Sequence, residues 1–187
     1  MATSATSRWR VPGMPRSLSV TPNGNLLLIC ACHGEPTKLV ELSADSGQSV
    51  REIALQSDIG PSRHSVQLAT GQFVVCHHGY CYGNREDLHR VCVVGDDGKV
   101  IRSYGGKRGS DVGRLNIPRH LAVDKDSQFI FVAEHDNARV VLLTPTLEFV
   151  RFVIEWLTEP CRLHFHQATR RLFVAQTQGG CVSVIQL

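Results

Sequence analysis

Cysteine and histidine side chains lie close together at two places in the sequence. The first is Cys30-Ala31-Cys32-His33 and the second is Cys76-His77-His78. Thiolates and imidazoles are ligands that zinc prefers in proteins. However, one residue between two cysteines is shorter than the usual zinc knuckle, and both segments end apolar, strand-like runs. We therefore predict no metal site and no cofactor.

Arginine recurs one or two residues after each of four prolines. The arginines are Arg16, Arg63, Arg119 and Arg162, and the prolines are Pro15, Pro61, Pro118 and Pro160. A guanidinium group binds carboxylates and phosphates through parallel N–H donors. The four arginines could therefore form a cationic collar for an acidic peptide, a phosphate group or an RNA backbone. Alternatively, they could bond carbonyls and acids within their own loops.

The four prolines also mark an internal repeat that must position these arginines. Fourteen residues after each proline comes an apolar residue (Ile29, Val75, Val132 and Val174), followed by a small one (Cys30, Cys76, Ala133 and Ala175). This second strand of each repeat is apolar on both faces, which is typical of a strand covered on each side by a neighbouring sheet. Spacings of 46, 57 and 42 residues between the prolines fit one four-stranded blade per repeat.

The repeat predicts an all-β fold, a β-propeller with four four-stranded antiparallel blades in a single domain over residues 1–187. The blades are expected at about 12–56, 57–106, 113–156 and 157–187. The last blade contains only three strands, and residues 7–11 are the candidate for its fourth. Either this N-terminal strand closes the ring, or the chain forms an open arc of a larger propeller. Exposed edges would then favour self-association.

The third repeat has the most specific pattern. It contains Tyr104-Gly105-Gly106, residues 113–124 ending in Asp124, Ile130-Phe131-Val132-Ala133 and Asn137-Ala138-Arg139-Val140. This pattern resembles the NHL repeat, in which a glycine-rich start and a proline precede two apolar strands and an Asn-x-Arg segment. The other three repeats lack the terminal Asp and the Asn-x-Arg segment. The NHL family forms propellers, often of six blades, in tripartite-motif ubiquitin ligases and in RNA-binding repressors. The sequence contains no RING or B-box segment.

One face of the predicted propeller carries an excess of basic residues. In an antiparallel blade, the connections from strand two to three and from strand four to the next blade emerge on the same side, which we call the loop face. The four arginines lie there, and further candidates for partner contact are Lys38, Arg90, Arg139, Tyr80 and Tyr82. The tyrosines lie in an insertion over residues 79–88. Tyrosine and arginine are enriched among interface hot spots.

Catalysis is a further possibility that the resemblance raises, because some related propellers are metal-dependent enzymes whose ligands converge from several blades. Here His64, His120 and His164 lie three, two and four residues after their prolines. We expect that side chains so far out of register do not all point inward. We therefore predict that the chain is not an enzyme, and a metal-dependent hydrolase or lyase is the second alternative.

Composition restricts the function less than the repeat does. The net charge is only +3, and the seven cysteines are an odd number without a visible export signal. The longest apolar run is far too short to cross a membrane. We predict a cytoplasmic module that binds a protein or peptide partner on the loop face. The resemblance implies that such a module could be the substrate-recognition part of a ubiquitin-ligase system. RNA binding through the same face is the first alternative.

Overall fold

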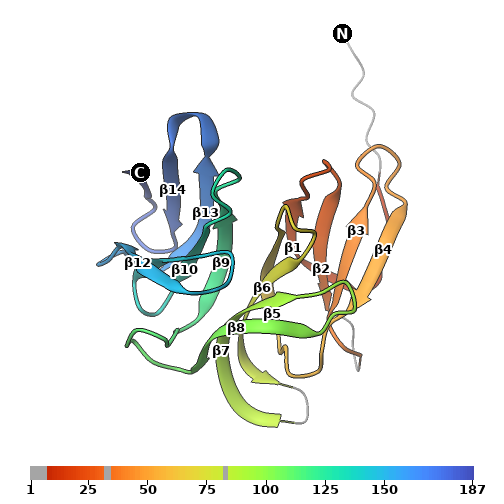
Figure 1. Cartoon of the computed structure of the whole chain (residues 1–187), viewed down its shortest axis with the longest axis horizontal. Helices are drawn as coiled ribbons and strands as arrows, with labels where there is room; N and C mark the ends of the chain where they lie inside the picture. The colour runs from red at the N-terminus through yellow and green to blue at the C-terminus, as the bar shows by residue number, and fades with distance from the viewer. Residues whose placement is uncertain (1–7, 32–34, 82–83) are drawn as a thin grey trace.

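The computed structural model describes residues 8–31, 35–81 and 84–187, and their side chains except those of residues 80–87. The described residues form antiparallel sheets (Figure 1). The first sheet consists of β1 (Met14–Val20), β2 (Leu26–Ala31), β3 (Lys38–Leu42) and β4 (Ser49–Ala54). The second consists of β5 (Ser62–Gln67), β6 (Phe73–Cys81), β7 (Asn84–Val94) and β8 (Val100–Lys107). The third consists of β9 (Pro118–Val123), β10 (Ile130–Glu134), β11 (Arg139–Leu143) and β12 (Phe149–Ile154). The fourth consists of β13 (Pro160–His166), β14 (Arg171–Gln176) and β15 (Val182–Gln186).

The arrangement confirms the all-β four-bladed β-propeller. Strands follow one another in chain order within every sheet, and the innermost strands pack in sequence, β1 on β5, β5 on β9 and β9 on β13. The fourth sheet has three strands among the described residues. The helical content of the described chain is a single 3-10 turn at Gln167–Thr169, so no helix there is long enough to cross a membrane.

Neighbouring sheets pack face to face, which explains why the second strand of each repeat is apolar on both sides. Ile29 of β2 and Val75 of β6 belong to one buried cluster between the first and second sheets. Val74 and Val132 belong to the next cluster, between the second and third sheets. Between the third and fourth sheets, the rings of Phe131 and Phe165 stack with centroids 5.2 Å apart. Alternate residues of one strand therefore serve two different interfaces.

The turn between the first two strands of each sheet needs a left-handed residue. Glycine supplies it in the first two sheets, with φ of 83° at Gly24 and 86° at Gly71. Gln128 and Arg170 adopt φ of 60° and 52° at the corresponding turns of the third and fourth sheets. A non-glycine residue accepts this conformation at a cost, which the surrounding contacts must offset.

The aspartate of the third repeat has a structural role. Asp124 is nearly fully buried at the end of β9 and accepts a hydrogen bond from Ser127 Oγ at 2.8 Å. It also accepts from Gln167 Nε2 at 2.6 Å and pairs with Arg170 Nη1 at 2.9 Å, both in the fourth sheet. Burial alone would raise the pKa of Asp124, but these hydrogen bonds outweigh it and lower the pKa to about 2. The aspartate thus fastens one sheet to the next.

The N-terminal segment does not supply the fourth strand of the last sheet. Residues 8–13 are outside any strand, and the Trp9 ring lies so close to Gly47 that a side chain at position 47 would collide with it. Gly47 belongs to the turn between β3 and β4 of the first sheet. Ser7, the first residue of the expected strand, lies outside the described residues. Of the two alternatives, the structure therefore has the open arc, with the first and fourth sheets at its two ends (Figure 1).

Apolar side chains remain exposed at both ends of this arc. In the first sheet, Leu18 and Val20 of β1 are 58% and 64% exposed. In the fourth sheet, Val182 and Val184 of the edge strand β15 are 57% and 54% exposed. Such side chains are normally covered by another blade in a propeller, and β15 also offers unpaired backbone groups.

We predict that the chain self-associates through these ends in a concentration-dependent way. Replacing Leu18 and Val184 together by Asp should shift the protein toward the monomer, because burying a charge at an apolar contact is costly. Size-exclusion chromatography with light scattering measures the mass. Val150→Asp on the outer strand β12 is the matched control, and a wild-type protein that is monomeric at every concentration would contradict the prediction.

Candidate functional site

The arginines that follow the prolines lie at the start of the innermost strands, next to the loop face. Arg16, Arg63 and Arg119 are each left out of the strand pairing, because β1, β5 and β9 all bulge there. A bulge leaves one residue unpaired and changes the direction of its side chain. Arg162 differs, since it pairs with Ala175 and the bulge falls on Cys161. Local backbone geometry therefore places three of the four guanidinium groups beyond the edge of their sheets.

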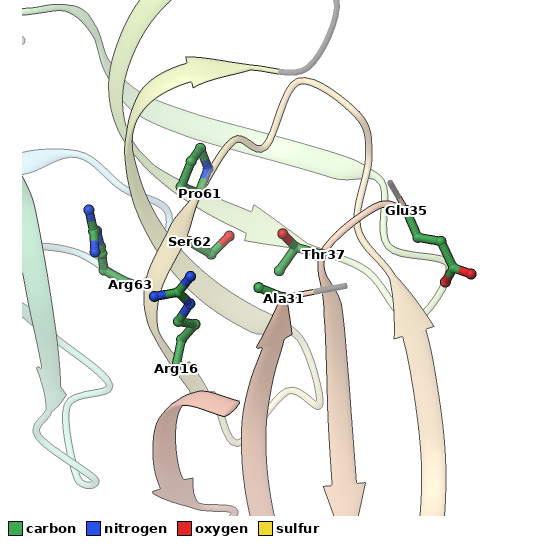
Figure 2. Close-up of a pocket in the computed structure, with 7 residues that line it drawn as sticks. All are labelled: Arg16, Ala31, Glu35, Thr37, Pro61, Ser62 and Arg63. Carbon is green, nitrogen blue, oxygen red and sulfur yellow. The ribbon is translucent and has the colours of Figure 1, made fainter. Parts of the chain in front are cut away.

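Two of these arginines line a pocket of about 230 Å³ between the first and second sheets (Figure 2). Arg16 and Arg63 share it with the hydroxyl-bearing Thr37 and Ser62. Glu35 lines the pocket as well, but its carboxylate lies 3.6 Å from Lys38 Nζ, and in Figure 2 its side chain points away from the arginines. The pocket can thus offer cationic and hydroxyl donors to an anion.

The arginines of different blades are close enough to influence one another. Burial lowers the pKa of Arg63, and the charges of Arg119 and Arg16 lower it further. The Arg63 Nε–H donates to His78 Nε2 at 2.8 Å, which leaves the imidazole as a neutral acceptor. Burial, Arg63, His89 and Arg119 together lower the pKa of His78 to about 4. Positive charge is therefore concentrated here and is not shared with a histidinium.

None of the four arginines forms an ion pair with an acid among the described residues, although Arg162 Nη1 donates to the Cys161 carbonyl at 2.8 Å. Arg16, Arg63 and Arg162 are exposed, and Arg119 is half-buried. Arg162 also acts on the interior, where its charge lowers the pKa of both His64 and His120. The four arginines thus lie near the starts of successive innermost strands, and a collar that binds a ligand through them stays a prediction.

The other basic residues predicted for partner contact are engaged internally. Lys38 lies between Glu35 and Glu52, with Nζ–O distances of 3.6 and 3.7 Å. Arg90 pairs with Asp58 at 3.0 Å and donates to His77 Nε2 at 3.1 Å. Partner binding by Lys38 and Arg90 stays a prediction.

Arg139 is even more deeply engaged than these two. Its guanidinium is 7% exposed, pairs with the fully buried Glu134, and stacks over the Phe152 ring at 4.1 Å. It also donates to the Ser110 carbonyl at 2.8 Å, while Asn137 donates to the Gly109 carbonyl at 2.9 Å. The Asn-x-Arg segment therefore holds the long connection between β8 and β9 in place.

The tyrosines of the insertion cannot be placed in the site. Tyr82 lies outside the described residues, and only the backbone of Tyr80 is described, in β6. Cys32 and His33 of the first cysteine-histidine segment lie outside as well. In the described chain, no three His, Cys, Asp or Glu residues converge as a metal would require. Cys76 is fully buried, and burial raises the pKa of its thiol to about 12, so it is a poor nucleophile at neutral pH.

The expectation that the proline-following histidines are out of register is wrong for two of them. The rings of His64 and His120 stack with centroids 3.6 Å apart and an interplanar angle of 24°. His64 pairs with Cys76 and His120 with Ala133, which are equivalent positions of the second strand. Strand pairing, rather than distance from the proline, decides which positions of two repeats are equivalent. The number of residues between the proline and the turn differs by one between the second and third repeats. His164, by contrast, is exposed and pairs with Phe173.

These two imidazoles connect neighbouring blades through backbone hydrogen bonds. His64 Nδ1 accepts from the Leu121 N–H at 3.4 Å, and the Leu18 carbonyl accepts from the His64 ring. His120 Nδ1 accepts from the Leu163 N–H at 3.3 Å. Each innermost strand pairs with the second strand of its own sheet and has no strand partner along its other edge. The imidazoles therefore satisfy backbone groups on that edge that would otherwise be unpaired.

A further candidate for partner contact, which the repeat pattern does not indicate, is Trp156, which follows β12 on the loop face. Its side chain is 93% exposed, and its backbone has φ of 64°. Exposed tryptophan is unusual and is enriched at interfaces. The only sequence signal was the residue type itself in a loop, since the repeat pattern does not extend to this position.

Comparisons with known proteins support the fold. No protein-family model matches the chain, and no curated protein matches it in sequence. Among solved structures, hydrazine synthase from Kuenenia stuttgartiensis is similar with a TM-score of 0.67 and 14% identity, covering 92% of this chain and 58% of that chain. A catalytically inactive virginiamycin B lyase from Staphylococcus aureus has a TM-score of 0.61 and 14% identity, covering 92% and 55%. The β-propeller domain of Cps50 (Swd1) from Myceliophteria thermophila has a TM-score of 0.58 and 15% identity, covering 93% and 51%.

Identities this low establish the β-propeller fold and nothing finer. The chain spans little more than half the length of these solved proteins. The prediction that the chain is not an enzyme is contradicted, because virginiamycin B lyase is an enzyme with the same fold. That prediction relied on the absence of a recognisable catalytic pattern in the sequence, whereas a propeller is a scaffold on which catalytic and binding sites both occur.

We predict that the free energy of unfolding falls as the pH is lowered from 7 toward 5. Burial lowers the pKa of His64 to about 4 and of His120 to about 2, both below the unfolded value of 6.5. Below pH 6.5 the unfolded chain therefore binds protons that the folded chain does not, at a cost of about 1.4 kcal/mol per pH unit for each imidazole. Chemical denaturation at several pH values measures this slope.

The slope should become shallower when His64 is replaced by Asn, whose side-chain oxygen can take the place of Nδ1 as an acceptor. His164→Asn is the matched control, because that ring is exposed. A slope that is identical in wild type and His64→Asn would show that the buried imidazole is not responsible.

A second prediction distinguishes arginines that stabilise the fold from arginines that are available to a ligand. Arg139→Ala should lower the free energy of unfolding by about 3–5 kcal/mol, because it leaves the buried Glu134 carboxylate unpaired. Arg16→Ala should change it by less than about 0.5 kcal/mol, because Arg16 is exposed and forms no ion pair in the described chain. Thermal and denaturant unfolding of both variants provide the comparison, and equal losses would contradict the distinction.

Proposed function

We propose that this chain binds an acidic or phosphorylated segment of a protein partner on its loop face, through Arg16, Arg63, Arg119 and Arg162. One observation carries the proposal. These four guanidinium groups, contributed by four successive blades, gather around the innermost strands without a described acidic partner. Elsewhere in the described chain, arginines such as Arg51, Arg90 and Arg170 are paired with carboxylates.

The electrostatics of the site favour an anionic ligand. Bringing Arg16 and Arg119 close enough to lower the pKa of Arg63 costs free energy, and a bound carboxylate or phosphate would offset that repulsion. The pocket of about 230 Å³ is below the usual size of a cofactor cleft but suits a single phosphate or carboxylate group. The Thr37 hydroxyl adds a neutral hydrogen-bond donor to the same pocket, whereas the Ser62 hydroxyl already donates to the Gly60 carbonyl at 3.2 Å.

We further propose that the chain is an NHL-type propeller, as the tripartite-motif-type proteins contain. The support is the third repeat, where Asp124, Asn137 and Arg139 of the motif hold neighbouring segments together. In that family the propeller recognises substrates for ubiquitin transfer, so a ubiquitin-ligase substrate is a candidate partner. RNA is the alternative ligand, because phosphate groups of its backbone would satisfy the same cations.

The test is fluorescence anisotropy with three labelled probes: a peptide of alternating glutamate and phosphoserine, its unphosphorylated counterpart, and a short single-stranded RNA. We expect the phosphopeptide to bind most tightly. Replacing Arg63 and Arg119 together by Ala should weaken it by at least about 100-fold, since a charge-assisted hydrogen bond contributes about 1.5–3 kcal/mol.

The matched control replaces Arg102 and Arg151, which are exposed on the outer strands β8 and β12, and removes the same charge. Tighter binding of the RNA, with a steep loss of affinity as salt increases, would favour the RNA alternative. Phosphopeptide binding that is equally strong in both double variants would rule out the arginine site.

A further inference from the structure

A second pocket lies on the loop face, where the third sheet meets the fourth. Its volume is about 520 Å³, and it is formed by the connection from β10 to β11, the connection from β12 to β13, and the segment that leads into β9. The polar side chains that line it include Arg108, Asn116, His135, Asp136 and Glu159. Most of these polar side chains can accept a hydrogen bond, in contrast to the pocket between the first two sheets, which Arg16 and Arg63 line.

Two carboxylates in this pocket face the same imidazole. His135 Nδ1 lies 2.7 Å from Asp136 Oδ1, and His135 Nε2 lies 3.5 Å from Glu159 Oε2. The ring thereby contacts both acids, and Gln178 Nε2 also donates to Glu159 Oε1 at 2.9 Å. Arg108 lines the same pocket, so the two carboxylates and this one guanidinium leave a formal balance of one negative charge.

Asn116 provides a further acceptor. Its side-chain oxygen is buried and receives no hydrogen bond within the described chain. Its backbone N–H donates to Glu134 Oε1 at 2.9 Å, so the residue is fixed by the same buried carboxylate that pairs with Arg139. An unsatisfied buried oxygen is costly, and a ligand N–H would reach this one only if the Asn116 side chain turned toward the pocket.

Trp156 directly precedes Leu157, which lines this pocket, and its indole is in solvent. The next residue, Leu157, is buried, and its N–H donates to the Ala138 carbonyl at 2.8 Å. The loop is therefore anchored on one side of Trp156, while the indole remains 93% exposed. The face of an exposed indole attracts cations, arginine side chains in particular.

From these features we propose that the second pocket binds an arginine side chain of the partner. Asp136 and Glu159 are acceptors for its guanidinium, and Trp156, which directly precedes the lining residue Leu157, would stack on its plane. Binding of an arginine side chain in this pocket goes beyond the proposed function. The additional claim that one partner fills both pockets rests on the proposed function.

The two pockets lie on the same loop face, one between the first two sheets and the other between the last two. The charge of Asp136 raises the pKa of His78, whereas Arg63 and Arg119 lower it, which places groups from both pockets around one imidazole. A segment with an acidic or phosphorylated residue and a nearby arginine would therefore find complementary charge at both of its ends.

The experiment uses Trp156 itself as the reporter. The chain has two tryptophans, so Trp9→Phe leaves Trp156 as the only one. N-acetylarginine amide is titrated at constant ionic strength, and N-acetylcitrulline amide, which has a similar shape but no charge, is titrated in parallel. We expect a saturable change of Trp156 emission with the arginine probe and no saturation with the citrulline probe.

Asp136→Asn and Glu159→Gln should each weaken the arginine probe by about tenfold, which corresponds to the loss of one charge-assisted hydrogen bond. Glu148→Gln removes the same charge on the opposite side of the sheet, in the turn between β11 and β12, and should change nothing. Equal responses to the two probes, or charge variants that bind arginine as well as the parent, would overturn the proposal.

The phosphopeptide is measured on the same proteins, so that the two proposals are tested separately. Binding of the arginine probe without binding of the phosphopeptide would support this second pocket. It would count against the phosphopeptide site formed by the four arginines. Phosphopeptide binding without a response to arginine would do the reverse.

Discussion

The structure depends on the packing of each sheet against its neighbours on both faces. A sheet in this propeller contributes alternate residues of one strand to two interfaces, as Val74 and Val75 do on opposite sides of β6. No single blade has a core of its own, so stability comes from the contact between blades. The same constraint explains the exposed valines and leucine at the two ends of the arc, where a sheet has only one neighbour.

Polar contacts between blades then fix how the sheets sit relative to one another. Asp124 joins the turn of the third sheet to the fourth, and the stacked rings of His64 and His120 carry hydrogen bonds between innermost strands. These contacts are buried or partly buried, and as hydrogen bonds they are directional where apolar packing is not. The connections on the loop face are attached to this rigid frame, which fixes the relative positions of their charged side chains.

The repeat made the fold predictable, because apolar residues at matched offsets from four prolines are what a series of identically built, stacked sheets requires. The details of the site were less accessible for physical reasons. Register on the innermost strands depends on bulges at Arg16, Arg63 and Arg119, and a bulge leaves no signature in residue type. Which arginines are free depends on partners distant in sequence, as Asp58 is for Arg90. The closure by residues 7–11 failed for a similar reason, since Trp9 packs on the first sheet instead.

The propeller leaves function to the loops, and the loops of this chain divide by charge. Between the first two sheets, the strand bulges direct Arg16 and Arg63 into a pocket that contains hydroxyl groups. Between the last two sheets, Asp136 and Glu159 converge on one histidine beside an exposed tryptophan. Because both pockets occupy the same face, that face presents positive charge at one sheet interface and carboxylates at another. A surface of that kind discriminates by the order and spacing of charges in a ligand, rather than by its net charge.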